Sequence, residues 1–227
     1  MRAIIKFTKE ENIRYISHLD ILRMFQRAVK RAELPVSYSC GFNPHMLIGF
    51  ACALPTGALS MAEYAEIRLD RELDCGMIKE RLNAVMPKGC RILGVKEILE
   101  GYPSLMAVVS RAEYSIEITD RSADGLIAEL VAAAAAASEI TVNKKTKKGV
   151  KPTDIRGMIH NLDYSEGAIH CVLDAGNSVN LRPDTLMEYF SRGLECFPEY
   201  RILRTALYIA QGGEIIDAFS AGGDSFD

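Results

Sequence analysis

The sequence predicts an α+β protein in which the order strand, helix, strand, strand, helix, strand occurs twice. Strand and helix signals alternate along the first hundred residues, turn-forming residues separate them, and the same pattern recurs loosely in the rest of the chain. The 227 residues are enough for two ordinary domains. A hydrophobic content of 48% and a charged content of 25% are typical of a globular protein with a core.

The first strand and the first helix of the N-terminal half have clear signals. Residues 3–7 are a short β-prone run. Ser17 and Asp20 have the S-x-x-D form of a helix start, in which the hydroxyl accepts a backbone amide and the carboxylate suits the positive helix end. Pro35 closes the helix. Apolar residues recur at helical spacing and predict one buried face: Leu19, Leu22, Phe25 and Val29.

The remaining elements of the N-terminal half follow in the same order. Residues 46–54 and 64–69 read as strands, joined by a turn at residues 55–57. A helix over residues 75–86 and a strand over residues 91–98 complete the set. This order is that of a ferredoxin-like domain, in which two helices cover one face of a four-stranded antiparallel sheet.

A boundary at residues 100–104 separates this half from a second one with the same order. Its predicted elements are a strand at 113–119, a helix at 122–137, a strand beginning at 140–143, strands at 155–162 and 168–173 around a turn, a helix at 183–194 and a strand at 202–209. We therefore expect two tandem ferredoxin-like domains, residues 1–101 and 102–211, the second with an insertion at 144–151. Residues 212–227 are rich in Gly, Ser and Asp, and we expect a flexible tail.

Charge and hydropathy exclude several classes of protein. The formal net charge is −3, so any nucleic-acid binding depends on local patches. Residues 1–7 are too short for a signal peptide and contain Lys6. No apolar run approaches the roughly 18 to 20 residues that span a bilayer. We expect a cytoplasmic protein that does not bind a membrane.

The cysteines and the missing motifs predict no metal and no cofactor. The six cysteines form no C-x-x-C pair and no close cluster, so we expect small buried hydrophobic residues: Cys40, Cys52, Cys75, Cys90, Cys171 and Cys196. The sequence contains no phosphate-binding loop, no G-x-G-x-x-G and no H-E-x-x-H. It also lacks the three-cysteine motif of radical S-adenosylmethionine (SAM) enzymes.

Residues 13–57 hold the densest set of candidate functional residues. A connector rich in polar, aromatic, glycine, proline and histidine residues is where function tends to lie. Within this region, residues 38–45 form such a connector, which we call the motif loop; its candidate residues are Tyr38, Ser39, Gly41, Phe42, Asn43, Pro44 and His45.

Two histidines of this region are candidate catalytic residues. A histidine near neutral pH can donate or accept the proton that phosphodiester cleavage requires, and His18 and His45 are both candidates. Structural roles are equally open. His18 lies in the first turn of a helix, where it can cap or pack, and His45 can close the turn after Asn43 and Pro44. No spacing decides between these interpretations, because catalytic groups assemble in space.

Two basic segments are candidate nucleic-acid contacts. The first follows one face of the first predicted helix: Arg23, Arg27, Lys30 and Arg31. The second is a predicted flexible loop: Lys144, Lys145, Lys147, Lys148 and Lys151. Both suit a polyanion such as RNA. A solvated charged surface is the alternative explanation for each of them.

The chain resembles a known family along nearly its whole length. The residues that carry the resemblance are Ile13 to Asp20, Arg31-Ala32, Leu34-Pro35-Val36, Tyr38-Ser39, Gly41 to His45, Leu54-Pro55-x-Gly57, Glu63-Tyr64, and Arg201-Ile202-x-Arg204-Thr205-x-Leu207-Tyr208. They closely resemble the radical-SAM-linked protein family, also described as domain of unknown function 2344. The family pattern commonly has Pro-Lys after the histidine, whereas Met46-Leu47 follows His45 here. Any anion contact by that lysine is therefore in doubt.

The resemblance implies a partner, although no reaction is established for the family. Its members are typically encoded beside, or fused to, a radical SAM protein with a cobalamin-binding region. Our leading hypothesis is a non-catalytic RNA-binding or substrate-adaptor module that acts with a separate radical SAM enzyme. A metal-independent endoribonuclease that uses His18 or His45 is the first alternative. A pure protein-interaction module is the second.

Overall fold

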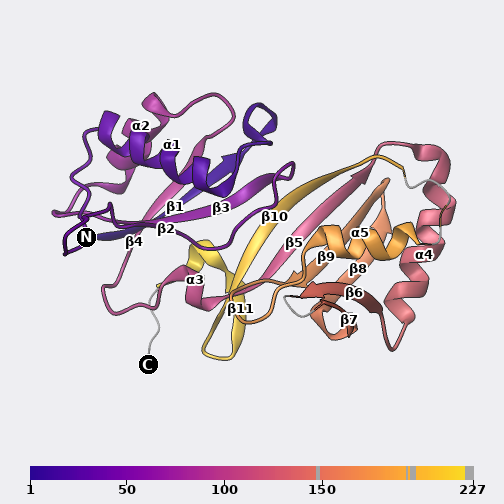
Figure 1. Ribbon diagram of the computed structural model, residues 1–227. Helices are drawn as coiled ribbons and strands as arrows, with labels where there is room; N and C mark the ends of the chain where they lie inside the picture. Colours follow the sequence, from indigo (N-terminus) through magenta and orange to yellow (C-terminus); the bar gives the residue numbers. More distant parts are fainter. Residues whose placement is uncertain (147–148, 193, 195–197, 223–227) are drawn as a thin grey trace. The chain divides into compact units, whose positions relative to one another are not determined.

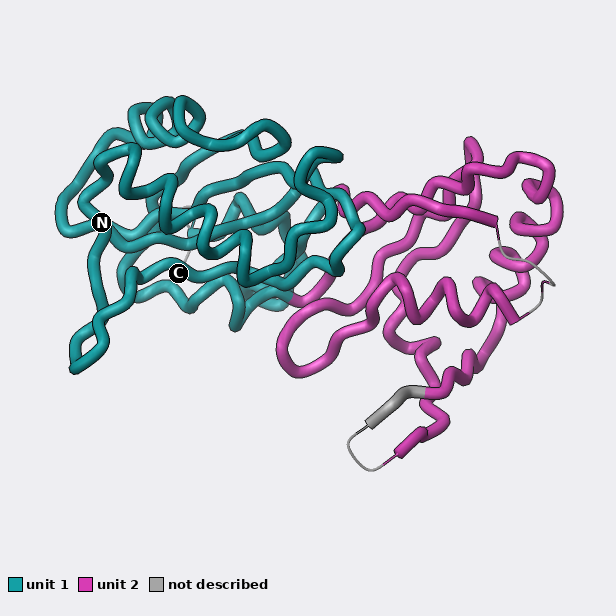
Figure 2. The backbone as a smooth tube through the Cα atoms, turned by 45° about the horizontal axis from the view of Figure 1, so that its top comes forward, with its two compact units in different colours: residues 1–109, 206–227 teal, residues 110–205 magenta. Residues whose placement is uncertain are grey.

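The computed structural model describes residues 1–146, 149–192, 194 and 198–222 (Figure 1). The chain divides into two compact units (Figure 2). Unit 1 comprises residues 1–109 and 206–227, and unit 2 comprises residues 110–205. The sequence predicted domains of residues 1–101 and 102–211. In the structure the first unit extends to residue 109 and also includes the residues from 206 onward, so the two ends of the chain belong to the same unit.

Unit 1 is built from strands and helices that alternate along the chain. Its strands are β1 (Arg2–Lys9), β2 (Ile48–Phe50), β3 (Leu59–Arg68), β4 (Ile92–Ile98) and β11 (Glu214–Asp217). Its helices are α1 (His18–Arg31), α2 (Cys75–Val85) and α3 (Leu105–Val108), and 3-10 turns occur at η1 (Glu11–Ile13) and η4 (Ala218–Ser220). Strand β10 (Tyr200–Gln211) has residues in both units.

Unit 2 follows the same alternation. Its strands are β5 (Val109–Ile118), which begins at the last residue of unit 1, β6 (Thr141–Thr146), β7 (Gly149–Asp154), β8 (Ile159–Ser165) and β9 (Ala168–Asp174). Its helices are α4 (Asp124–Ala136) and α5 (Pro183–Ser191), with 3-10 turns at η2 (Arg121–Ala123) and η3 (Arg156–Met158).

The protein belongs to the α+β class, as predicted. Nine of the described strands form one hydrogen-bonded sheet, in the order β4-β1-β3-β10-β5-β9-β8, with β2 paired to β3 and β11 paired to β10. Strands β6 and β7 form a separate two-stranded sheet. In unit 1 the β1-β3, β1-β4 and β2-β3 pairs are antiparallel, and so are the β5-β9 and β8-β9 pairs of unit 2.

Helix α1 begins where the sequence predicts, although its buried face is rotated. The Ser17 hydroxyl accepts a hydrogen bond from the Asp20 amide at 3.2 Å, which satisfies one of the free amides of the first turn. Leu19 is 61% exposed, so the predicted apolar face is wrong at this position. The helix residues that are buried instead are Ile21, Met24, Phe25, Ala28 and Val29. The helix ends at Arg31, before Glu33 with a left-handed φ of 52°.

The core of unit 1 lies between its sheet and the helices α1 and α2, which cover one face of that sheet (Figure 1). Three aromatic rings meet at its centre. The ring centroid of Phe7 lies 4.7 Å from that of Phe25 and 6.0 Å from that of Phe50, and Phe25 and Phe50 are 5.4 Å apart. Such tilted and edge-on contacts are the favoured aromatic geometries. They fix the middle of α1 against β1 and β2.

The two strands on either side of the turn at residues 55–57 both differ in length from the prediction. Strand β2 covers only Ile48–Phe50 of the predicted 46–54, whereas β3 begins at Leu59 rather than at residue 64. The reason is pairing: β1 pairs with Glu63–Arg68 and, after a register shift between Phe7 and Lys9, with Ser60, so β3 extends beyond its own alternating pattern. Alternating hydrophobicity does not reveal the partner of a strand.

The segment after Gln211 is structured as far as residue 222, where a flexible tail was expected. Strand β11 pairs with β10, and Ala218 and Ala221 are fully buried. The Phe219 ring centroid lies 6.4 Å from that of Tyr64, and the Tyr64 hydroxyl donates to Asp217 at 3.3 Å. The glycine-rich composition suggested disorder, but a few apolar side chains are enough to anchor the segment. Residues 223–227 lie outside the described residues.

The described residues of the lysine-rich segment of unit 2 form two antiparallel strands and not the predicted loop, and Lys147 and Lys148 lie outside them. In the β6-β7 pair, Lys144 lies opposite Lys151 and Lys145 opposite Val150. Strand β8 begins at Ile159 because the η3 turn occupies residues that were predicted as strand. The predicted turn after β8 narrows to Glu166 and Gly167, both with positive φ. None of the helices in the described part of the chain has the length and apolarity that a membrane crossing requires.

Candidate nucleic-acid interface

The two predicted histidines both lie on the surface, with different neighbours. The His18 ring is exposed and meets the Phe50 ring edge-on at 5.3 Å between centroids. His45 is also exposed, and its Nδ1 lies 2.8 Å from the Ser39 hydroxyl. Among the described residues, no hydrogen bond or ring contact joins the two histidines, so neither acts as the acid–base partner of the other in this structure.

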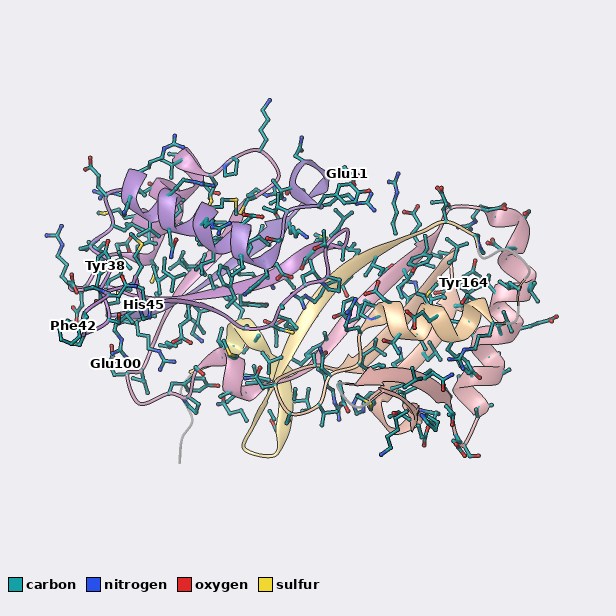
Figure 3. All side chains as sticks on the ribbon, viewed as in Figure 1. Glu11, Tyr38, Phe42, His45, Glu100 and Tyr164 are labelled. Carbon is teal, nitrogen blue, oxygen red and sulfur yellow. The ribbon has the colours of Figure 1, made fainter. Side chains whose placement is uncertain are left out.

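The motif loop is held closed by its own backbone. The amide of Ser39 donates to the carbonyl of His45 at 2.9 Å, and the amide of His45 donates to the Ser39 hydroxyl at 3.1 Å. Tyr38 pairs with Met46 in an isolated bridge. Figure 3 places Tyr38, Phe42 and His45 at one end of unit 1 and Glu11 at the other. The exposed residues at the tip of the loop are Gly41, Phe42, Asn43 and Pro44.

His45 lines a shallow hollow of about 330 Å³ together with Glu66 and Arg68. Arg68 is not free for an anion, because its Nη2 lies 2.7 Å from the Glu100 carboxylate. Glu66 is bound in turn by Arg2 at 2.7 Å. The charges of this hollow are therefore satisfied within the protein.

The predicted basic segments lie in different units. Arg23, Arg27, Lys30 and Arg31 are all exposed on α1 in unit 1, whereas the lysines of the β6-β7 pair belong to unit 2. Arg23 is partly neutralised, because its Nη1 lies 2.9 Å from Asp20. Lys151 is exposed on β7, and Lys147 and Lys148 lie outside the described residues.

A groove between α1, α2 and the start of β4 collects cations that the sequence did not group. It has two adjoining hollows, of about 770 and 310 Å³, which share Met86 and Pro87. Five basic residues line it, and we call it the cationic groove: Arg27, Arg31, Lys79, Lys88 and Arg91. Glu10 is the one carboxylate among the lining residues.

The cations of the groove are unpaired with carboxylates. Within the described part of the chain, none of the five has a carboxylate oxygen within 4.0 Å. The Arg31 guanidinium donates a long hydrogen bond to the Val85 carbonyl at 3.4 Å. Elsewhere in unit 1, Arg2, Arg14 and Arg68 are each bound by glutamate. Unpaired cations that line two adjoining hollows favour an anionic ligand.

The floor of the groove is rigid. The Asn83 side chain donates to the Ile92 carbonyl at 3.1 Å and accepts from the Ile92 amide at 2.8 Å, which ties α2 to β4. The Glu10 amide donates to the Gly89 carbonyl at 2.8 Å, and Thr8 donates to the Glu10 carboxylate at 2.9 Å. Lys88 and Arg91 therefore project from a short connection that is anchored on both sides.

Sequence reasoning identified only the α1 half of this groove. The segment Pro87-Lys88-Gly89 reads as a turn, and Lys79 and Arg91 belong to no recognisable charge run. Lys79, Lys88 and Arg91 meet where α2 is followed by β4, and the packing of α1 beside α2 adds Arg27 and Arg31. In the sequence, the one local sign of this part of the groove was that Lys88 and Arg91 closely follow Pro87.

The cysteines differ from the expectation that all are buried. Cys90 and Cys171 are buried, Cys52 and Cys75 are half-buried, and Cys40 is exposed on the motif loop. Cys196 lies outside the described residues. No group of three histidine, cysteine, aspartate or glutamate residues in the described part of the chain is arranged to hold a metal ion.

A thiol reagent at pH 8 should modify Cys40 first and Cys90 and Cys171 last. Burial raises the pKa of both buried thiols to about 12, and nearby carboxylates add to this. Since the thiolate is the reactive form, these two thiols are protonated as well as shielded. Mass spectrometry of the partially labelled protein measures the order. Equal rates at Cys40 and Cys90 in the folded protein would contradict it, and unfolding in urea should make the rates similar.

Comparison with known families and proteins gave one match. A family model described as "Uncharacterized protein conserved in bacteria (DUF2344)" matches residues 2–183. No curated protein matches the chain. The matched region includes the motif loop and every residue of the cationic groove.

Proposed function

The chain belongs to the DUF2344 family, and we propose that it is a non-catalytic RNA-binding module whose cationic groove contacts phosphates. One observation carries this proposal: five basic side chains line the groove, together with a single carboxylate, and none has an ion-pair partner among the described residues. A protein with a net charge of −3 has no general attraction for nucleic acid. Its cations must therefore be concentrated locally to bind one.

The groove suits a phosphate backbone better than a small anion. It is an extended, open surface, and its cations come from two helices and a connection. Each cation that neutralises a phosphate releases counterions, which gives affinity without sequence preference. The exposed Lys30 extends the positive surface along α1, and the lysines of the β6-β7 pair in unit 2 offer a second set of contacts.

We further propose that this module works with a separate radical SAM enzyme, as a substrate adaptor. The support is the resemblance of residues 13–57 to the radical-SAM-linked family. Retention of the enzyme on the tagged protein after nuclease treatment would support a direct contact. Loss of the enzyme after the same treatment would leave RNA as the link between the two.

We also propose that each unit has a ferredoxin-like fold. The strand order β4-β1-β3-β2 supports this in unit 1, with α1 after β1 and α2 after β3. In unit 2 the order β10-β5-β9-β8 supports it, with the β6-β7 pair as an addition. An experimental structure in which β2 or β8 takes another place in the sheet would contradict this proposal.

Filter binding of cellular RNA at low and at moderate salt tests the RNA-binding function. Single strands that contact four phosphates through cations should lose affinity with a slope of about −3 in log K against log salt, because the slope is about −0.7 per phosphate. Retention that does not depend on salt, or no retention at low salt, would remove the RNA proposal.

An endoribonuclease remains the second candidate, because both histidines are exposed and Ser39 orients the His45 ring. A histidine within reach of a phosphodiester can act as general base. Replacing His18 or His45 by alanine should then abolish cleavage and leave binding intact. Binding without any cleavage by the unaltered protein would remove this candidate.

A further inference from the structure

We infer that the Tyr15 ring is a stacking platform for an unpaired base of the bound RNA, an inference that rests on the proposed RNA-binding function. Tyr15 belongs to residues 13–20, which carry part of the family resemblance, but it does not line the cationic groove. Its side chain is 71% exposed, in a position between the η1 turn and helix α1. A single exposed aromatic residue is common, so the inference depends on what supports the ring.

A guanidinium supports the ring. The Cζ atom of Arg14 lies 4.9 Å from the centroid of the Tyr15 ring, which is within the range of a cation–π contact. The Arg14 side chain itself is only 15% exposed. One face of the ring is therefore covered by a mostly buried cation, while most of the side chain remains accessible to solvent.

Arg14 is fixed on several sides, so the support is rigid. Its Nε donates to the Gly57 carbonyl at 3.1 Å, and its Nη1 donates to the Glu11 carboxylate at 2.9 Å. Its own carbonyl accepts from the Gly57 amide at 2.9 Å and from the Lys9 ammonium at 2.7 Å. The hydrogen bond to Glu11 raises the pKa of Arg14 above its usual value, which keeps the guanidinium charged.

Gly57 lies next to the Tyr15 ring. The residue has a left-handed φ of 89°, and a Cβ atom there would lie 3.7 Å from Cε1 of Tyr15. The turn at residues 55–57 therefore lies against the edge of the ring. Together with the hydrogen bonds between Arg14 and Gly57, this contact joins the Ile13–Asp20 and Leu54–Gly57 segments, which are distant in sequence.

The segment that carries Tyr15 is in contact with the wall of the cationic groove. Glu10 and Gly89 line the groove, and the η1 turn connects Glu10 to Arg14. A Cβ atom on Gly89 would lie 2.9 Å from the Cβ of Asn12, so the groove wall and the η1 turn are in direct contact. A single strand with its phosphates on Lys88 and Arg91 has the platform close by for a base.

The chemistry of the platform favours a base over an apolar side chain of a partner protein. Exposed aromatic rings beside a cationic groove are the usual arrangement for single-stranded nucleic acids, and an arginine beneath the ring strengthens its stacking. A duplex hides the faces of its bases, so it gains nothing from Tyr15. The expected specificity is thus for unpaired over paired RNA.

Replacing Tyr15 by alanine should weaken binding of a single-stranded RNA by about 10-fold, because stacking on one aromatic ring contributes about that factor. Tyr15→Phe should bind as the unaltered protein, and affinity for a duplex of the same length should not change in either variant. Leu99→Ala is the surface control and should keep the affinity of the unaltered protein, because Leu99 is a 66% exposed apolar residue of unit 1 that lies outside the cationic groove and the motif loop. Fluorescence anisotropy with labelled single-stranded and duplex RNA measures the affinities of the unaltered protein and of the three variants.

A tryptophan at this position gives a second, direct readout. The chain contains no tryptophan, so Tyr15→Trp introduces a single indole whose emission a stacked base quenches. Single-stranded RNA should quench it, and duplex RNA should not. Absence of quenching together with unchanged affinity in Tyr15→Ala would overturn the inference, while loss of binding in Lys88→Glu/Arg91→Glu would still support the RNA-binding function. Single-strand binding that neither the alanine nor the glutamate variant weakens would remove that function as well.

Discussion

Exchanging both Lys88 and Arg91 for glutamate should weaken single-stranded RNA binding at least 10-fold at low salt. The exchange removes two phosphate contacts and places two negative charges at the centre of the cationic groove. The slope of log K against log salt should also fall in magnitude by about 1.4, because each contact contributes about 0.7. Fluorescence anisotropy at four salt concentrations measures both quantities.

The matched control for this exchange is Arg71→Glu/Arg201→Glu. Both arginines are exposed, and neither lines the cationic groove, so the control changes the net charge by the same amount. It should keep most of the affinity and the original salt slope. Equal losses in the two double variants would mean that RNA responds to the overall charge, and the groove would lose its role.

Replacing Arg2 by methionine should lower the free energy of unfolding by about 3–5 kcal/mol, because it breaks a buried ion pair. Arg2 is buried, and its Nε donates to Glu66 at 2.7 Å. Its Nη1 atom donates to the Tyr102 carbonyl, and its Nη2 donates to the Pro103 carbonyl at 3.2 Å. Methionine fills much of the space but leaves these acceptors without a donor. Urea denaturation followed by circular dichroism measures the loss.

A double-mutant cycle with Glu66→Gln separates the ion pair from the carbonyl contacts. The double variant should be less destabilised than the sum of the single ones, since removing both charges leaves no buried carboxylate unpaired. Arg71→Met is a surface control, because Arg71 is exposed, and it should change stability by less than about 0.5 kcal/mol. A loss of that small size in Arg2→Met would contradict the structural role of Arg2.

Local signals were sufficient to predict most elements of the fold. Ser17 with Asp20 marks the start of α1, and the helices α2, α4 and α5 lie close to their predicted ranges. Elements that depend on distant partners were missed. Strand β3 is longer than its own alternation suggests because its pairing with β1 continues past a register shift to Ser60. Phe219 anchors a segment whose composition suggested disorder.

The candidate site was predicted only in part, for the same reason. The basic stripe of α1 was visible as a helical spacing, but the other half of the cationic groove comes from α2 and from the connection to β4. Similarly, Arg14 and Gly57 were noted as separate motifs, and only their two hydrogen bonds reveal one platform. Charge and motif patterns identify the participants of such a site, whereas packing decides which of them meet.

Ultraviolet cross-linking of the full chain to single-stranded RNA, followed by mass spectrometry of the peptides, tests the central claim most directly. We predict cross-links in the segments 79–93 and 14–31, which contain the cationic groove and Tyr15. Cross-links confined to residues 141–154, or to the motif loop, would contradict the assignment of RNA binding to the groove.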